Sequence, residues 1–137
     1  MKKAFAGKVN FNMGFFYLLF SMGIVYTISS PVIIEIGERI GRDISDTGLM
    51  FSFYFIGFIG GSLLNNLLTK YFNRKKLVLF FTFLVTISTF SVFFIFNYPF
   101  LLFTFFMIGI SVGFIEAQAS VLMIEVNREN EGLFMNL

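Results

Sequence analysis

The chain of 137 residues contains no cysteine and no histidine. Without cysteine it can form no disulfide bond, no thiolate nucleophile and no cysteine-ligated metal site. Without histidine it lacks the side chain that most often shuttles protons or binds metals near neutral pH. It also has no paired carboxylates within one hydrophobic run and no glycine-rich loop of the phosphate-binding kind. We therefore expect no enzymatic activity, no cofactor and no metal.

Charge is scarce, because Asp, Glu, Lys and Arg make up only 13% of the residues, whereas 57% are hydrophobic and the mean hydropathy is +0.84. Long uncharged runs cover residues 9–34, 47–69 and 77–115. Each run reaches the ~20 residues with which a helix crosses a bilayer. The alternating segments of about ten residues that build an outer-membrane barrel are missing. The composition therefore predicts an integral membrane protein built from transmembrane helices.

The third uncharged run is too long for one helix, and Pro99 divides it because proline and the residue before it disfavour helical continuation. The first run is too long for the apolar region of a cleaved signal peptide, so we expect it to be retained. The result is an all-α transmembrane fold with four membrane-spanning helices, at approximately residues 11–34, 47–69, 77–96 and 100–124.

The basic residues lie mainly on one side of these spans. Eight of the ten Lys and Arg residues stand before the first span, between the second and third, or after the fourth. The other two are Arg39 and Arg42, which have Glu35, Glu38 and Asp43 as neighbours. Since cytoplasmic loops carry the excess of Lys and Arg, we expect a multi-pass protein of the plasma (cytoplasmic) membrane with both chain ends in the cytoplasm. Its expected partner is the lipid bilayer, and we expect it not to bind nucleic acid.

Glu116, in the segment GFIEAQAS, interrupts the hydrophobic fourth span. A rotation of about 100° per residue places it on one helix face with Gly109, Gly113 and Ser120. At ~1.5 Å per residue it lies roughly 25 Å from Pro99, near the middle of the bilayer, where a lipid-facing charge would cost at least ~2.5 to 3.5 kcal/mol. Such groups usually mark an ion, proton or substrate path. The alternative is a structural carboxyl group held between helices.

Other polar side chains can share in that site. Ser111, Gln118 and Glu125 are spaced by seven and line a nearly opposite face of the fourth span, so protein or water must surround much of this helix. In the first span, Tyr26 belongs to the polar stretch YTISSP, which is either a kinked helix end or part of a cavity lining. The candidate residues for proton coupling or substrate binding are Glu116, Ser120, Gln118 and Tyr26.

Glycines at a spacing of four let two helix backbones approach closely. The second span carries Gly57 and Gly61, and the fourth carries Gly109 and Gly113. We expect these four glycines to serve helix packing, a role that by itself does not identify a function.

The segment NNLLTKYFNRKK, between the second and third spans, resembles the loop signature G-x-x-x-D-[RK]-x-G-[RK]-[RK] of the major facilitator superfamily (MFS). The corresponding positions are Asn65, Thr69, Lys70, Asn73, Arg74 and Lys75. The three basic residues match, asparagines replace the two glycines, and Thr69 replaces the aspartate. The resemblance implies a gating role for this cytoplasmic loop. Asn73 is a tolerable replacement because asparagine reaches left-handed backbone geometry more readily than other non-glycine residues.

GFIEAQAS is also similar to the pattern G-x-x-E-x-x-x-N in the fourth helix of the fucose and related sugar:proton symporters of this superfamily. Gly113 and Glu116 match, and Ser120 stands where the asparagine would be. The aspartate that those symporters carry in the first helix has no counterpart in SMGIVYTISSPVI. The resemblance implies an alternating-access secondary transporter for a small polar solute, such as a sugar, with proton coupling at Glu116.

MFS members have twelve spans in two six-helix halves, with the binding site between the halves. The resemblance therefore implies that residues 1–137 are a partial N-terminal MFS domain, in which residues 132–137 begin a fifth span. The expected partners are the small-molecule substrate, protons and the remaining helices of the full-length transporter. Two other functions stay open. One is an MFS exporter of drugs or metabolites, which the 23 Phe residues would suit; the other is a non-transporting subunit that packs into a larger complex through its glycine faces.

Overall fold

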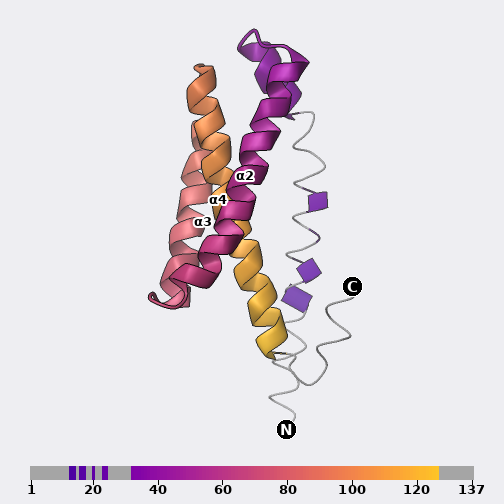
Figure 1. The fold of residues 1–137 in the computed structure, drawn as a ribbon. Helices are drawn as coiled ribbons and strands as arrows, with labels where there is room; N and C mark the ends of the chain where they lie inside the picture. The colour runs from indigo at the N-terminus through magenta and orange to yellow at the C-terminus, as the bar shows by residue number, and fades with distance from the viewer. Residues whose placement is uncertain (1–12, 15, 18–19, 21–22, 25–31, 127–137) are drawn as a thin grey trace. The chain divides into compact units, whose positions relative to one another are not determined.

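The computed structural model describes residues 13–14, 16–17, 20, 23–24 and 32–126. Three helices lie wholly within the described part: α2 (Ile44–Leu68), α3 (Arg74–Ser91) and α4 (Tyr98–Val126) (Figure 1). Residues 32–39, which precede α2, are also helical, and the described residues include no strand. The predicted all-α class is therefore confirmed for this part of the chain.

A tight turn at Gly41 closes the helical stretch that precedes α2. The N–H of Gly41 donates to the carbonyl oxygen of Glu38 at 3.0 Å, and the N–H of Arg42 donates to that of Gly37 at 2.9 Å. Gly41 has a φ of 69°, a left-handed conformation that glycine adopts without a steric penalty. This pattern satisfies carbonyl groups that the end of a helix leaves without intrahelical partners.

Two of the predicted spans correspond to long apolar helices. Among the described residues, the segments long and apolar enough to cross a membrane are Ser45–Leu68 in α2 and Tyr98–Glu125 in α4. The predicted break at Pro99 is also present, because the chain leaves helical geometry between α3 and α4. Pro99 lies in the first turn of α4, where its missing N–H removes no intrahelical bond.

The ends of the other predicted spans differ from the structure. Instead of covering residues 77–96, α3 begins at Arg74 and ends at Ser91, and its 18 residues fall slightly short of the ~20 that cross a bilayer perpendicularly. The hydroxyl of Ser91 donates to the carbonyl oxygen of Ser88 at 2.8 Å. The first span was predicted to end at Ile34, but helical structure continues to residue 39. Most of that span, and the segment 132–137, lie outside the described residues.

Residues 31–118 form one compact unit, and the packing described here lies within it. Its apolar core joins the helical residues 32–39, α2, the chain after α3 and the first half of α4, through the buried residues Ile33, Ile36, Met50, Val92, Leu101 and Phe105. Further along α4, the fully buried ring of Phe114 stacks on the ring of Phe81 from α3, with centroids 4.1 Å apart and planes inclined by 19°. Because Val92 packs near Leu101 and Phe81 near Phe114, α3 and α4 run in opposite directions.

α2 and α4 touch backbone to backbone through glycines. A Cβ atom at Gly61 would overlap the carbonyl oxygen of Ile110, and a Cβ atom at Gly113 would overlap that of Phe58. The same holds one turn earlier on each helix, at Gly57 and Gly109. Residue numbers rise together along the contact, so the two helices are parallel. We call this region the α2–α4 glycine contact.

Candidate functional site

Glu116 lies well inside α4, a helix of 29 residues. At ~1.5 Å per residue it is about 27 Å from Tyr98 and about 15 Å from Val126. Its side chain is half-buried. The neighbouring Gly109 and Gly113 face the backbone of α2, so α2 fills the space that these small residues leave. Along this face of α4, Glu116 therefore follows directly after the α2–α4 glycine contact.

A second polar face of α4 is deeply buried. Ser111 and Gln118 are exposed by 0% and 2% respectively. The hydroxyl of Ser111 donates to the carbonyl oxygen of Met107 at 2.8 Å, so it is satisfied within its own helix. Gln118 differs, because its Nε2 atom has no hydrogen-bond partner among the described residues. Gln118 thus offers an unused donor in the interior of the protein.

Three of the four predicted site residues lie on α4. Helical rotation of about 100° per residue separates Glu116 from Gln118 by about 200°, so the two side chains leave the helix on opposite faces. Ser120 is exposed, one turn after Glu116. Tyr26 lies outside the described residues. The structure therefore places Glu116 and Gln118 on one helix without bringing them into one cluster.

The α2–α3 loop shows what Thr69 does in place of an aspartate. The N–H of Thr69 donates to the carbonyl oxygen of Asn65 at 3.1 Å, and its hydroxyl donates to the same oxygen at 2.7 Å. Thr69 therefore closes the C-terminus of α2 through two local hydrogen bonds. Both bonds are local to the end of α2 and involve no charged group.

The expectation that Asn73 has left-handed backbone geometry is wrong. Its φ of −66° and ψ of 122° are extended values, and no described residue other than glycine has a positive φ. Asn73 is instead the N-cap of α3, and its Oδ1 atom accepts a hydrogen bond of 2.9 Å from the N–H of Lys75. Asparagine is favoured there because it satisfies an N–H that has no intrahelical partner. The basic side chains of Lys70, Arg74 and Lys75 are exposed around it.

Arg39 has a role that the sequence did not reveal. Its guanidinium group donates to the carbonyl oxygens of Val92 at 3.0 Å, Ile95 at 3.4 Å and Phe93 at 3.5 Å, and it lies 5.0 Å from the ring centroid of Phe96. The side chain therefore caps carbonyl groups at and beyond the C-terminus of α3. No local pattern could have indicated this, since Val92 is 53 positions away.

Arg42, three residues further along the chain, also contacts an aromatic ring near the start of α4. Its guanidinium lies 4.8 Å from the ring centroid of Tyr98 and 3.4 Å from the carboxylate of Asp46. The hydroxyl of Tyr98 in turn donates to the backbone carbonyl oxygen of Asp46 at 2.8 Å. Both arginines between the first and second predicted spans thus contact the chain where α3 leads into α4, Arg39 at the connection itself and Arg42 at Tyr98, the first residue of α4.

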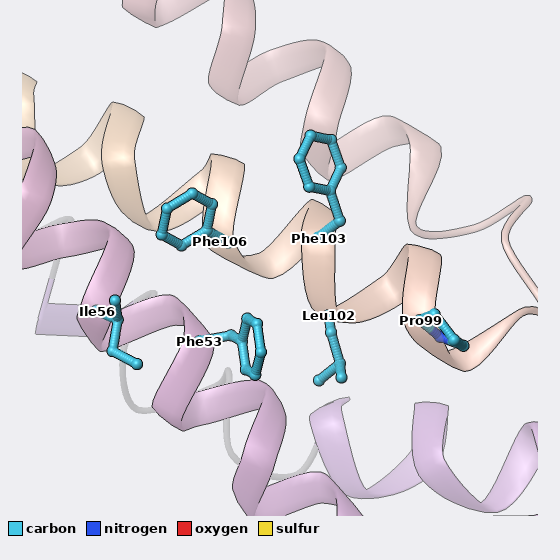
Figure 2. Close-up of a pocket in the computed structure, with 6 residues that line it drawn as sticks. All are labelled: Phe53, Ile56, Pro99, Leu102, Phe103 and Phe106. Atoms are coloured by element: carbon cyan, nitrogen blue, oxygen red, sulfur yellow. The ribbon is translucent and has the colours of Figure 1, made fainter.

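An open apolar groove of about 450 Å³ lies between α2 and α4. Its lining consists of Phe53 and Ile56 from α2 and Pro99, Leu102, Phe103 and Phe106 from α4. Figure 2 shows Phe53 and Leu102 reaching into the space between the two helices. None of these side chains can donate or accept a hydrogen bond, so the groove suits apolar groups. Along α4 it lies before the α2–α4 glycine contact, whereas Glu116 lies after it.

Comparison with known proteins identifies the family. The family model of the Major Facilitator Superfamily matches residues 15–137, which include all three complete helices and the basic α2–α3 loop. No curated protein and no solved structure matches the chain. The two long apolar helices agree with a membrane protein. The chain therefore belongs to the major facilitator superfamily of membrane transporters.

Proposed function

We propose that this chain belongs to a secondary transporter that moves a small polar solute by alternating access and couples its movement to protons. The observation that carries the proposal is Glu116, a half-buried carboxylate well inside an apolar helix of 29 residues. Ionisable residues inside membrane-spanning segments are costly, and they usually mark ion, proton or substrate paths. Glu116 is accordingly the proton-coupling residue.

A carboxylate supplies coupling because its charge changes with each proton that binds or leaves. A proton that binds one transporter conformation better than the other shifts the population between them. Ser120, one turn after Glu116, would belong to the proposed solute site. Gln118, on the opposite face of α4, and Tyr26 are separate candidates for solute contacts, and the sugar assignment rests on the pattern G-x-x-E in the fourth helix.

The proposed architecture is the N-terminal part of a twelve-helix transporter, with four spans in residues 1–137 and a fifth beginning at residues 132–137. Its remaining helices would cover α2, α3 and α4, and the two halves would rock around a central site. The exposed Lys70, Arg74 and Lys75 support a cytoplasmic α2–α3 loop with a gating role. Both chain ends would then lie in the cytoplasm and the spans in the plasma membrane.

Glu116→Gln in the full-length protein tests this function, with transport measured in sealed vesicles. We expect the variant to fold and to exchange labelled L-fucose or D-glucose across the membrane, but to lose accumulation driven by a pH gradient. Glu125→Gln is the matched control, because Glu125 is an exposed glutamate on the same helix. Unchanged dependence of accumulation on the pH gradient in Glu116→Gln would show that Glu116 does not couple protons.

A second candidate function is export of apolar compounds. The apolar groove between α2 and α4 favours this function. Such a transporter would bind its substrate through apolar surface, with few fixed polar groups. Efflux of a lipophilic cation from vesicles, compared with uptake of sugars, separates the two candidates. Replacing Leu102 by Asn in the groove would slow efflux of the cation and leave sugar uptake unchanged.

A further inference from the structure

Large apolar side chains form an exposed stripe along one face of α3. The residues of this α3 stripe, each at least 50% exposed, are Leu79, Phe80, Phe83, Ile87 and Phe90. A rotation of about 100° per residue places all five on one side of the helix. Phe81 and Ser88, on the roughly opposite side, are buried, and Phe81 stacks on α4. One face of α3 therefore packs against the protein, and the other presents apolar surface outward.

A basic cluster stands at the beginning of the α3 stripe. Its four exposed residues are Lys70, Arg74, Lys75 and Lys76. Lys76 lies on the same face as the stripe, because it precedes Phe83 by seven residues, or about two turns. The sequence has no Asp or Glu between Asp46 and Glu116, and no carboxylate among the described residues pairs with Lys75 or Lys76. Positive charge is thus available at one end of an apolar surface.

Two exposed aromatic residues, Tyr71 and Phe72, lie within the basic cluster. Tyrosine is enriched where a membrane meets water, because its ring is apolar and its hydroxyl is polar. α3 runs alongside α4, whose segment Tyr98–Glu125 is long and apolar enough to cross a membrane. The α3 stripe then lies at the level of lipid acyl chains, and the lysines lie at the level of the phosphate groups.

We propose that Lys75, Lys76 and the α3 stripe bind an anionic phospholipid. Its phosphate contacts the two lysines, and an acyl chain lies along the stripe as far as Phe83. At ~1.5 Å per residue, Phe83 is about 10 Å from Lys76 along the helix, which is within the ~15 Å that one leaflet contributes to the hydrocarbon core. Basic residues at a membrane surface attract anionic lipids. The proposal needs α3 to lie in a bilayer but does not depend on proton coupling at Glu116.

Quenching of a single tryptophan by brominated lipids tests the proposal, because residues 1–137 contain no tryptophan. Full-length Phe83→Trp, with any tryptophan outside these residues replaced by Phe, is placed in phosphatidylcholine vesicles. A small share of brominated phosphatidylglycerol or brominated phosphatidylcholine is then included. We expect the anionic lipid to quench more strongly. Lys75→Gln with Lys76→Gln should lower this preference at least about fivefold, the contribution of one basic residue near an anionic surface, whereas Lys75→Arg with Lys76→Arg should retain it.

Two controls separate a site on α3 from general attraction between charges. Lys2→Gln with Lys3→Gln removes the same charge from another basic segment, and it should leave the preference at Phe83→Trp unchanged. Phe103→Trp moves the reporter to an exposed position near the start of α4. That start lies at the opposite end of the antiparallel α3–α4 pair from Lys76. The reporter there should be quenched equally by the two lipids.

Equal quenching of Phe83→Trp by the two brominated lipids would overturn the proposal, and this comparison needs no lysine variant. Quenching by neither lipid would also overturn it, by showing that another helix of the full-length transporter covers the α3 stripe. A preference that survives Lys75→Gln with Lys76→Gln, or that falls equally in Lys2→Gln with Lys3→Gln, would exclude the two lysines as the phosphate contacts. These results are independent of Glu116→Gln, whose readout is accumulation driven by a pH gradient, so failure of one proposal is distinguishable from failure of the other.

Discussion

The guanidinium group of Arg39 donates a hydrogen bond of 3.0 Å to the carbonyl oxygen of Val92, which directly follows α3. Carbonyl groups at the C-terminus of a helix lack intrahelical partners and carry a partial negative charge. A cation is therefore stabilised there, and the ring of Phe96 adds a favourable contact with its face. One side chain thus ties the end of the helical stretch 32–39 to the connection that leads into α4.

We expect Arg39→Ala to lower the stability of the full-length protein by about 1 to 2 kcal/mol, because it removes charge-assisted hydrogen bonds to backbone carbonyls at a partly exposed site. Arg39→Lys keeps the charge but lacks the planar fork, so it should restore only part of this loss. Thermal midpoints in detergent measure both effects. Equal midpoints for the parent and Arg39→Ala would show that the contact contributes nothing.

The α2–α4 glycine contact predicts opposite outcomes for two adjacent glycines. Gly61→Ala places a methyl group against the carbonyl oxygen of Ile110, and overpacking of this kind costs about 1 to 3 kcal/mol. A Cβ atom at Gly60 would meet nothing within 4 Å, so Gly60→Ala should be neutral or slightly stabilising, since alanine favours helix by up to about 1 kcal/mol. Thermal midpoints that fall equally in both variants would contradict the close approach.

The capping role of Asn73 predicts which substitutions α3 tolerates. Asn73→Ala removes the acceptor for the N–H of Lys75 and should cost about 0.5 to 2 kcal/mol. Asn73→Asp keeps the acceptor and should retain the parental stability. A midpoint for Asn73→Asp as low as that of Asn73→Ala would indicate that backbone geometry, rather than the cap, determines this position.

Packing between α3 and α4 depends on the stacked rings of Phe81 and Phe114. Phe114 is fully buried, so Phe114→Ala leaves a cavity and should cost about 3 to 5 kcal/mol. Phe83→Ala is the control, because the side chain of Phe83 is 65% exposed. The fraction of protein that stays monodisperse after heating, followed by size-exclusion chromatography, compares the two. Comparable losses in the two variants would show that the Phe81–Phe114 stack contributes no more to stability than an exposed phenylalanine does.

Much of the fold follows from the long hydrophobic runs and the helix-breaking proline in the sequence. Uncharged runs predict α2 and α4, and Pro99 predicts the break between α3 and α4, because these signals are local. The end of α3 was predicted too late because hydrophobicity continues to Phe96, while the residue that caps the helix, Arg39, lies in a distant part of the chain. Side chains that act across such separations leave no pattern in a single sequence.

The candidate site was predictable only in part. A carboxylate in an apolar run is visible in the sequence, so Glu116 could be nominated directly. The sequence also places Gln118 on a nearly opposite face, but it cannot show that the Nε2 atom of Gln118 is buried and has no partner among the described residues. The burial of Gln118 arises from tertiary packing around α4, which no local pattern encodes.

The glycine contact also sets an order of events during synthesis. Gly109 is made 52 residues after Gly57, so at ~5 to 20 residues per second α2 must wait roughly 3 to 10 s for α4 to emerge from the ribosome. During that interval the glycine face of α2 lacks its partner on α4 and can contact lipid, the insertion machinery or the segments made before Gly109. The α2–α4 glycine contact therefore forms only after the whole of α3 has been made, so at this contact assembly skips the helix that comes next in the chain.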